Sequence, residues 1–275
     1  MPERSDSPRR GAAFFDLDRT LIAGSSAYHF ARAGRRAGLL SRRQLAADAW
    51  ANIRFRLQGS TDEGTAALRD RIAASIEGVP VRRLMRLTPE VLAGVLPLLY
   101  RQMLAEAYRH QDEGRRIYIV TAASQEMAEM LAHVLQFDGG IGYRTEIRDG
   151  VFTGRPDGPF TYREGKAVAI RELAEREGID LAESWAYSDS ESDLPMLRCV
   201  GHAVVVNPDA ELTRIARAEG WPVMRFERLG RRLKVTAAVL AAVAGGAGAV
   251  AARRTSLRRS VASLSRPRRF GIAAR

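Results

Sequence analysis

Two aspartates separated by one residue follow the first apolar stretch of the chain. Asp16 and Asp18 come directly after residues 12–15, whose sequence AAFF is typical of a buried parallel strand. Side chains two positions apart on an extended segment point the same way, so both carboxylates are expected at the strand end. There they could hold a divalent cation and divide the roles of nucleophile and acid–base catalyst. An acidic turn without function is the simpler alternative.

A hydroxyl and an amine that suit a phosphate group occur further along the chain. Thr121 ends the apolar stretch IYIV, and Ala122 stands between it and a helical pattern that begins at Ser124. A hydroxyl beside free amides at a helix N-terminus forms a phosphate site, so Ala122 is counted as a substrate-binding position. Lys166 opens another helical pattern and could neutralise phosphoryl charge, although a surface lysine is the commoner case. The P-loop pattern GxxxxGK[ST] does not surround it.

A second acidic segment follows the apolar stretch WAY. Its sequence YSDSESDLPM contributes Asp189 and Asp193, which are expected at another strand end. The alternative is a solvated acidic loop. Hard oxygen ligands favour Mg²⁺ over zinc. The four histidines are scattered without metal-ligand spacing, and Cys199 is expected to be buried and not catalytic.

The elements that must position these residues alternate along the chain. Strands are expected at 12–15, 117–120, 185–187, 203–206 and 223–226, and helices at 124–136 and 166–177. A hairpin is expected at 144–155 around Asp149-Gly150. This order predicts an α/β fold with a Rossmann-like parallel sheet, whose ligands bind at the carboxyl ends of the strands.

The stretch between the first two strands is helical in pattern and carries several helix-start signals. Ser41–Gln44 and Ser60–Glu63 fit capping boxes, and Thr88 is expected to cap a helix that begins at Pro89. The predicted organisation is a disordered tail at 1–11, a catalytic core at 12–24 and 115–227, an inserted helical cap at 25–114, and a basic tail at 228–275.

The net charge of +11 is concentrated in the tail. Residues 228–275 hold twelve Arg or Lys and no acidic residue, whereas the rest of the chain has 31 basic and 32 acidic side chains. A nucleic-acid partner is therefore not expected, because its basic surface should belong to the folded domain. Within the tail, residues 235–252 form an uncharged stretch near the lower length limit for a membrane helix. The alternatives are a helix in or on the membrane, and a flexible Ala/Gly helix beside a solvated tail.

The N-terminus and the cysteine content indicate a compartment. Residues 1–11 are polar and lack an apolar export signal, and the one cysteine cannot form an internal disulfide. We expect a cytoplasmic protein, either free or attached to the cytoplasmic membrane by the C-terminal segment.

The four clusters, taken together, resemble the haloacid-dehalogenase superfamily of phosphatases. The motifs DLDRT, VTAAS, EGKAVAIRELA and YSDSESDLPML, followed by GHAVVVNPD and GWPV, cover about residues 12–227. Within the superfamily the chain is most similar to the phosphoserine-phosphatase-like branch, subfamily IB. The long gap between the first and second motifs matches the all-helical C1-type cap of that branch.

The resemblance implies a role for each motif. Asp16 would attack phosphorus and become an aspartyl-phosphate, and Asp18 would protonate the leaving oxygen and then activate water. Thr121 and Lys166 would hold the phosphoryl oxygens.

The same resemblance implies a Mg²⁺ site. Its ligands would be Asp16, the main-chain carbonyl of Asp18, and Asp189, while Asp193 would support either Lys166 or the metal.

Some positions depart from the family pattern. Arg19 replaces the small residue that often follows the second aspartate, and Ser25 replaces a glutamate that holds the substrate ammonium in amino-acid phosphatases. Phosphoserine is therefore a doubtful substrate, although Arg54 or Arg56 could bind an anionic group. The expected function is hydrolysis of a small-molecule or lipid-linked phosphate ester. The alternatives are phosphoryl transfer by the same site, and a catalytically idle, membrane-tethered scaffold.

Overall fold

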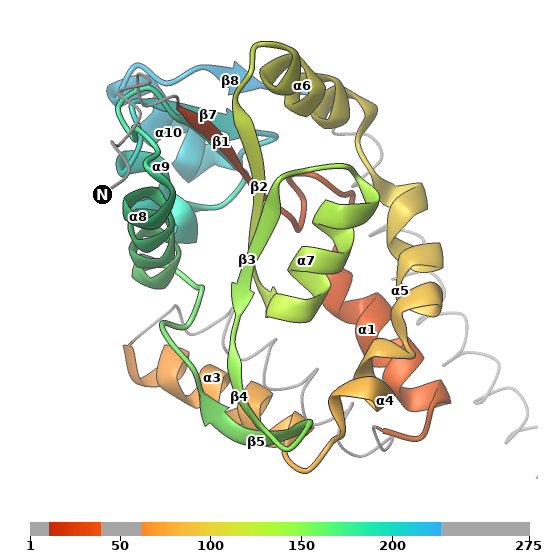
Figure 1. Ribbon diagram of the computed structural model, residues 1–275. Coiled ribbons are helices and arrows are strands. Elements are labelled where there is room, and N and C mark those ends of the chain that lie inside the picture. Colours follow the sequence, from red (N-terminus) through yellow and green to blue (C-terminus); the bar gives the residue numbers. More distant parts are fainter. Residues whose placement is uncertain (1–10, 40–61, 227–275) are drawn as a thin grey trace, which may run out of the picture. The chain divides into compact units, whose positions relative to one another are not determined.

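Six parallel strands form the main sheet of the computed structural model, which describes residues 11–39 and 62–226 (Figure 1). The strands are β1 (Ala12–Asp16), β2 (Arg116–Ser124), β3 (Gly139–Tyr143), β6 (Trp185–Ser188), β7 (His202–Val206) and β8 (Val223–Met224). Five of them overlap the five predicted strands, although β8 is only two residues long. The strand β3 was not predicted, because its sequence GGIGY is rich in glycine, which disfavours strands.

The strand order β3-β2-β1-β6-β7-β8 places β1 in the middle of the sheet. The chain adds β2 and β3 on one side of β1, and then β6, β7 and β8 on the other. The register pairs Asp16 with Val120 of β2 and Phe15 with Tyr187 of β6. The strand order therefore reverses beside β1, and such a switch point is where open α/β sheets bind their ligands.

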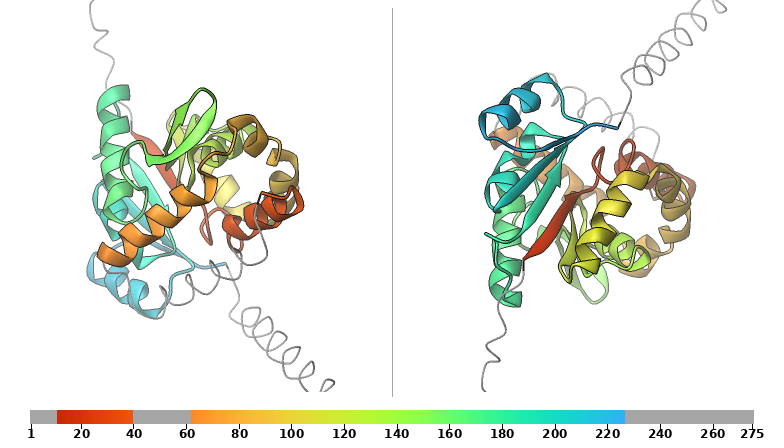
Figure 2. Two further views of the ribbon diagram at one scale, coloured as in Figure 1. Left: turned by 90° about the horizontal axis from the view of Figure 1, so that it is seen from below. Right: turned by 90° about the horizontal axis from the view of Figure 1, so that it is seen from above.

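Both faces of the sheet are covered by helices (Figure 2). Alternate side chains of β1 divide between two separate cores. Phe15 packs in the core with α6 (Arg101–Asp112) and α7 (Gln125–Val134), and Phe14 in the core with α8 (Glu164–Glu177), α9 (Leu194–Arg198) and α10 (Ala210–Ala218). A strand buried on both faces needs a continuous apolar sequence, which explains why AAFF is the first recognisable element of the chain.

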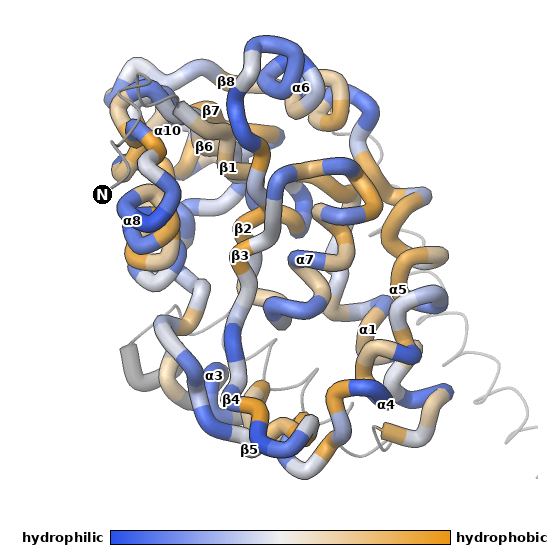
Figure 3. Tube along the Cα trace, viewed as in Figure 1, coloured by the Kyte–Doolittle hydropathy of each residue, from blue (hydrophilic) through white to orange (hydrophobic). Residues whose placement is uncertain are grey.

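Within the described residues, four α-helices follow β2 in the chain and flank the sheet. They are α7 (Gln125–Val134), α8 (Glu164–Glu177), α9 (Leu194–Arg198) and α10 (Ala210–Ala218). Hydrophilic and hydrophobic residues alternate along α8, as expected for a helix with one buried face (Figure 3). Gly178 ends α8 in a left-handed conformation with φ of 67°, as the sequence predicts.

The described residues between β1 and β2 form an inserted helical region. It contains α1 (Ser26–Arg36), α3 (Asp62–Ile76), α4 (Val81–Met85), α5 (Thr88–Val95), the 3₁₀ helix η1 (Leu96–Leu98) and α6 (Arg101–Asp112). A Rossmann-like core with a helical insertion is therefore the fold, as predicted.

The predicted cap of α5 is wrong. Thr88 is the first helical residue, and Leu87 precedes the helix with φ of −78° and ψ of −16°, without a side-chain capping hydrogen bond. Leu87 already has helical backbone angles because the chain enters α5 almost directly from α4, so an extended capping residue has no place there. The predicted capping boxes at Ser41 and Ser60 involve residues outside those described.

The predicted hairpin is present as β4 (Thr145–Arg148) and β5 (Val151–Pro156), joined by Asp149-Gly150. Both turn residues have positive φ, 49° and 75°, as two-residue hairpin turns require. Hydrogen bonds connect this hairpin to the helical insertion: the amide of Val81 donates to the carbonyl of Gly150 at 2.9 Å, and the amide of Phe152 to that of Val79 at 3.1 Å. These hydrogen bonds therefore attach the hairpin to the helical insertion.

The expected membrane segment at 235–252 and the rest of the basic tail lie outside the described residues. Of the helices that are described, none has the length and apolar content needed to cross a membrane.

Candidate active site

A buried lysine joins two carboxylates at the edge of the sheet where β1 ends. The amine of Lys166 donates to Oδ1 of Asp16 at 2.5 Å and to Oδ2 of Asp193 at 2.8 Å. All three residues are less than 10% exposed. Lys166 and Asp16, which are 150 positions apart in the chain, therefore share one charged cluster away from bulk water.

The position of Lys166 follows from the packing of α8. Lys166 lies in the first turn and shares the buried side of the helix with Ile170 and Leu173, four and seven residues later. Packing these apolar residues against the sheet also buries the lysine side chain. Gly165 is required beside it, because a Cβ there would lie 1.7 Å from the carbonyl oxygen of Phe160.

Asp193 is held from two directions. Its Oδ2 accepts a hydrogen bond from Ser188 Oγ at 2.7 Å in addition to that from Lys166. Ser188 is the last residue of β6, and Asp193 ends the short 3₁₀ helix η2 (Glu191–Asp193). The loop after β6 therefore turns back so that Asp193 fixes the amine that faces Asp16.

The electrostatics of the cluster show a surplus of negative charge. Burial raises the pKa of Asp16 to about 8 against the opposing influence of Lys166, and the carboxylates of Asp193 and Asp189 add to the increase. Burial acts to lower the pKa of Lys166, but Asp16 and Asp193 outweigh it and raise that pKa above its ordinary value. The lysine is therefore a permanent cation, and Lys166 and Arg19 together face three carboxylates, those of Asp16, Asp189 and Asp193.

Asp18 is held at the entrance to the helical insertion. Its Oδ2 accepts from Ser25 Oγ at 2.9 Å, and its Oδ1 accepts from the amide of Ser26 at 2.8 Å. Ser26 is the first residue of α1, so the carboxylate lies at a helix N-terminus, where negative charge is favoured. Ser25, at the position that carries glutamate in the amino-acid phosphatases that the sequence resembles, thus contacts Asp18.

A contact between two loops places Asp189 beside β1. The amide of Asp189 donates to Thr20 Oγ1 at 3.0 Å, and Thr20 is fully buried. The Oδ2 of Asp189 lies 2.9 Å from Nε of Arg19. The loop that follows β1 therefore fixes the backbone and the side chain of Asp189 through consecutive residues.

Of the other predicted positions, Thr121 and Ala122 lie near the site, and two arginines lie outside the described residues. Thr121 is buried one residue beyond the partner of Asp16 on β2, and its Oγ1 accepts from the amide of Ala123 at 3.1 Å. Ala122 follows it and is half-buried. Arg54 and Arg56 lie outside the described residues.

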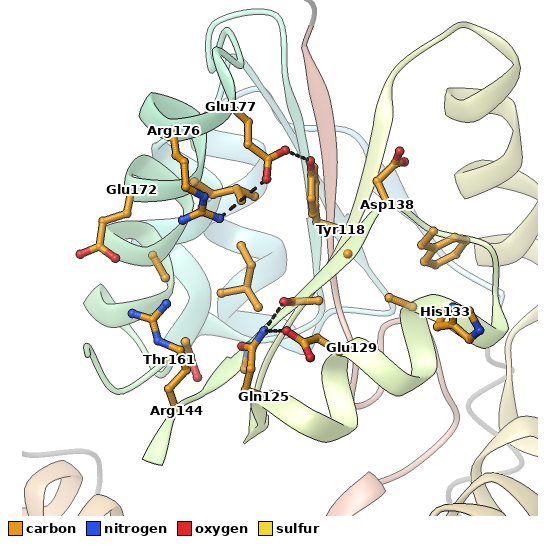
Figure 4. Close-up of a pocket in the computed structure, with 18 of the residues that line it drawn as sticks. Tyr118, Gln125, Glu129, His133, Asp138, Arg144, Thr161, Glu172, Arg176 and Glu177 are labelled. Atoms are coloured by element: carbon orange, nitrogen blue, oxygen red, sulfur yellow. Dashed lines mark hydrogen bonds and ion pairs between the residues drawn. The ribbon is translucent and has the colours of Figure 1, made fainter. Parts of the chain in front are cut away.

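A separate cavity of about 420 Å³ lies along the outer edge of the sheet, between α7 and α8 (Figure 4). Its walls include Gln125 and Glu129 of α7, Glu172 of α8, and the glycines of β3. The carboxylate and lysine cluster does not line this cavity. The chemistry of the site therefore belongs to the sheet edge at β1 and not to this cavity.

The donor set can be tested for its fit to Mg²⁺. Within the described ranges no three acidic, histidine or cysteine side chains are already grouped as a metal cage. Mg²⁺ commonly uses one or two carboxylates and keeps several water ligands, so such a cage is not required. Asp16 and Asp189 are close enough for one to raise the pKa of the other, and Arg19 and Lys166 provide the present positive charge. The chemistry of these donors suits a divalent cation.

Cys199 has no part in this chemistry. Its thiol donates to the carbonyl oxygen of Met196 at 3.1 Å, and burial raises its pKa to about 11. A thiol with that pKa is a poor nucleophile at neutral pH, in agreement with the expectation that Cys199 is not catalytic. The expectation of burial is met only in part, because the residue is half-buried.

Comparison with known proteins decides the family. A family model described as haloacid dehalogenase-like hydrolase matches residues 13–198, about two thirds of the chain. The chain belongs to the haloacid dehalogenase-like hydrolases. A protein named phosphoserine phosphatase SerB1, from Mycobacterium tuberculosis (strain ATCC 25618 / H37Rv), is 39% identical over 250 residues, which cover 89% of this chain and 81% of that protein.

Solved structures agree with this assignment. A protein of unknown function from Bordetella pertussis Tohama I is 28% identical with a TM-score of 0.70, over 78% of this chain and 98% of that one. A phospho-aspartyl intermediate analogue of phosphoserine phosphatase has the same fold, with a TM-score of 0.54 and 17% identity over 83% and 99% of the two chains. The family, together with the 39% identical relative named a phosphoserine phosphatase, identifies the chain as a phosphatase, and the predicted resemblance is confirmed.

Three contacts of the site were not predicted from the sequence. The DLDRT motif gives no separate role to Thr20, the strand exit at WAY gives none to Ser188, and Arg19 stands out in the sequence only as a departure from the family pattern. The burial of Lys166 does have a signal in the sequence. Lys166 lies four and seven residues before Ile170 and Leu173, so it falls on the apolar face of the helix, where a charged residue is unusual.

Proposed function

We propose that this protein is a Mg²⁺-dependent phosphomonoester hydrolase that forms an aspartyl-phosphate on Asp16. The observation that carries the proposal is the buried amine of Lys166, bonded to both Asp16 and Asp193 at the switch point of the sheet. A permanent cation beside a buried carboxylate is suited to binding an anionic substrate against that carboxylate. A lysine that served only to stabilise the fold would not need to lie at the carboxyl ends of the strands, where such sheets bind their ligands.

In the first step a carboxylate oxygen of Asp16 attacks phosphorus, and the bond from phosphorus to the ester oxygen breaks. Asp18 gives its proton to that departing oxygen, which leaves as an alcohol. Lys166 neutralises the charge on the phosphoryl oxygens, with the hydroxyl of Thr121 and the amide of Ala122 as further donors. Asp193 and Ser188 keep the lysine amine in place.

In the second step Asp18, now a carboxylate, takes a proton from a water molecule, whose oxygen attacks phosphorus. The bond between phosphorus and the Asp16 oxygen breaks, which releases inorganic phosphate and restores the carboxylate. The hydrogen bonds from Ser25 and Ser26 orient Asp18 for both proton transfers.

The proposed metal ligands are Asp16, the main-chain carbonyl of Asp18, and Asp189. Mg²⁺ held there would neutralise the surplus carboxylate charge and polarise a phosphoryl oxygen. Asp193 is assigned to Lys166 and not to the metal, because its Oδ2 already accepts from Lys166 and Ser188.

The proposed substrate is a small-molecule or lipid-linked phosphate ester. A relative is named a phosphoserine phosphatase, yet in this chain Ser25 contacts Asp18 and offers no carboxylate to a substrate ammonium group. Attachment to the cytoplasmic membrane through residues 235–252 remains a proposal from the sequence.

Hydrolysis of p-nitrophenyl phosphate by the purified full-length protein tests the proposal. We expect activity with Mg²⁺, complete loss in EDTA, and recovery when excess Mg²⁺ is restored. Activity that survives EDTA, or that is absent against a broad panel of phosphate esters, would contradict it. Including phospholipid head-group phosphates and amino-acid phosphates in the panel separates the substrate classes.

A further inference from the structure

Arg19 stands in a conformation that does not suit an arginine. Its φ is 64°, in the left-handed region, and its amide donates to the carbonyl of Gly24 at 3.1 Å across the loop after β1. A residue with a Cβ pays an energetic cost for this backbone, which glycine would avoid. Such an outlier beside a functional site indicates that the side chain makes a compensating contact.

The compensating contact is with Asp189. Nε of Arg19 lies 2.9 Å from Oδ2 of Asp189, and the arginine side chain is 50% exposed while that of Asp189 is 5% exposed. The neighbouring Thr20 accepts from the amide of Asp189, so the carboxylate is held within reach of the guanidinium. One partner is therefore fixed and buried, and the other reaches it from the solvent side.

The two cations of the site differ in how easily they can move. Lys166 is 3% exposed and bonded to two carboxylates, so withdrawing it would leave buried charge unpaired. Arg19 is already half in water and can release Asp189 with little further change in its own solvation. Of these two cations, Arg19 is the one that a metal ion can displace.

We propose that Arg19 is a built-in counterion for Asp189, which it holds in the metal-free protein and releases when Mg²⁺ binds. This inference rests on the proposed function, in which Asp189 is a metal ligand. Arg19 is a positioning residue: it keeps a buried carboxylate neutralised and ordered until the metal arrives. Because the metal must break this ion pair, Arg19 lowers the affinity of the site for Mg²⁺.

Mg²⁺ binding to the full-length protein, freed of metal by EDTA and dialysis, tests the inference by isothermal titration calorimetry without substrate. We expect Arg19→Ala to bind Mg²⁺ about fivefold more tightly than the wild type. Its melting temperature should also rise more on Mg²⁺ addition. Arg19→Gly, which fits the left-handed backbone, should show the same tightening even where the alanine variant is unstable, and Arg19→Lys should stay near the wild type.

Arg198→Ala is the matched control. Arg198 is 55% exposed and lies 2.8 Å from Glu219, so its removal also deletes one half-exposed ion pair and one positive charge. We expect it to leave Mg²⁺ affinity unchanged. Unchanged or weaker binding in Arg19→Ala and Arg19→Gly, with normal binding in the wild type, would overturn the role of Arg19 alone. A wild type that binds no Mg²⁺ would overturn both this inference and the proposed function.

Discussion

Strand β6 contributes to two buried polar clusters that differ in how their charges are balanced. At its carboxyl end, Ser188 and the following loop belong to the carboxylate and lysine cluster, where negative charge is in surplus and the pKa of Asp16 is raised to about 8. One residue earlier, Tyr187 belongs to a network on the face covered by α6. The phenol donates to Glu106 at 2.6 Å and also contacts His110 Nε2 at 2.7 Å.

The second network is internally satisfied. Because the Tyr187 proton is used on Glu106, Nε2 of His110 must be the donor to the phenol oxygen. The other ring nitrogen, Nδ1, then accepts from Arg115 Nη1 at 3.1 Å. Each of these groups has a complementary partner, as expected of a polar network that stabilises a fold.

The difference between the two clusters shows how a functional site can be distinguished from a polar network that only stabilises the fold. A network that balances itself needs no ligand, whereas the cluster around Asp16 is completed only by adding positive charge and an anion that Lys166 can bind. The same strand, with side chains on adjacent residues, therefore serves stability at Tyr187 and chemistry at Ser188.

The largest expected effect is that of removing the lysine. Lys166→Met should lower phosphatase activity about a thousandfold, because phosphoryl charge is no longer neutralised. It should also lower the free energy of unfolding by about 3 kcal/mol, because two buried carboxylates lose their partner. Enzyme kinetics and urea denaturation measure the two effects.

The matched control for this variant is Arg116→Met. Arg116 pairs with Glu177 at 2.8 Å and is 50% exposed, so its loss should cost less than about 1 kcal/mol and leave activity unchanged. Equal effects from the two variants would show that Lys166 is an ordinary ion-pair residue.

Acid should weaken the satisfied network. Burial, together with Arg109 and Arg115, lowers the pKa of His110 to about 4, whereas an unfolded histidine titrates near its ordinary value of 6.5. Between those values the unfolded chain binds a proton that the folded protein does not. The contribution of His110 is therefore complete above pH 6.5 and is lost as the pH falls toward 4, by about 3 kcal/mol in total.

Urea denaturation between pH 7 and pH 4.5 measures this loss. Substitution of His110 by Gln, which keeps a donor for Tyr187, should flatten the pH dependence of the unfolding free energy. An equally steep dependence in the variant would place the titrating group elsewhere.

The smallest expected effect is that of the phenol. Tyr187→Phe keeps the ring that stacks on Phe15 at 4.4 Å but removes the hydroxyl between His110 and Glu106. We expect a loss of about 1 kcal/mol in unfolding free energy and activity within about twofold of the wild type. A large fall in activity without a change in stability would link the two clusters functionally and break the comparison.

Much of the framework could be predicted from the sequence because its signals are local. Continuous apolar segments such as AAFF identify strands buried on both faces, and Asp149-Gly150 identifies the hairpin. The strand β3 escaped prediction because glycines remove the apolar pattern. The cap of α5 was misplaced because α4 delivers an already helical backbone to Leu87.

The pairings within the site could not be predicted in the same way. Residue types and spacing suggested Asp16, Lys166 and Asp189, but the partner of each depends on contacts between distant loops. The hydrogen bond from Ser188 to Asp193 depends on how the chain turns back after β6. The pairing of Asp189 with Arg19, and not with Lys166, depends on the left-handed backbone at Arg19.

Trapping of the phosphorylated enzyme tests the central claim most directly. The full-length protein would be mixed with Mg²⁺ and p-nitrophenyl phosphate, quenched in acid during turnover, digested, and analysed by mass spectrometry. We predict one phosphoryl group on the peptide that contains Asp16, sensitive to hydroxylamine as an acyl-phosphate is, and its absence in Asp16→Asn. Turnover with phosphate on another residue, or undiminished hydrolysis by Asp16→Asn, would contradict the account.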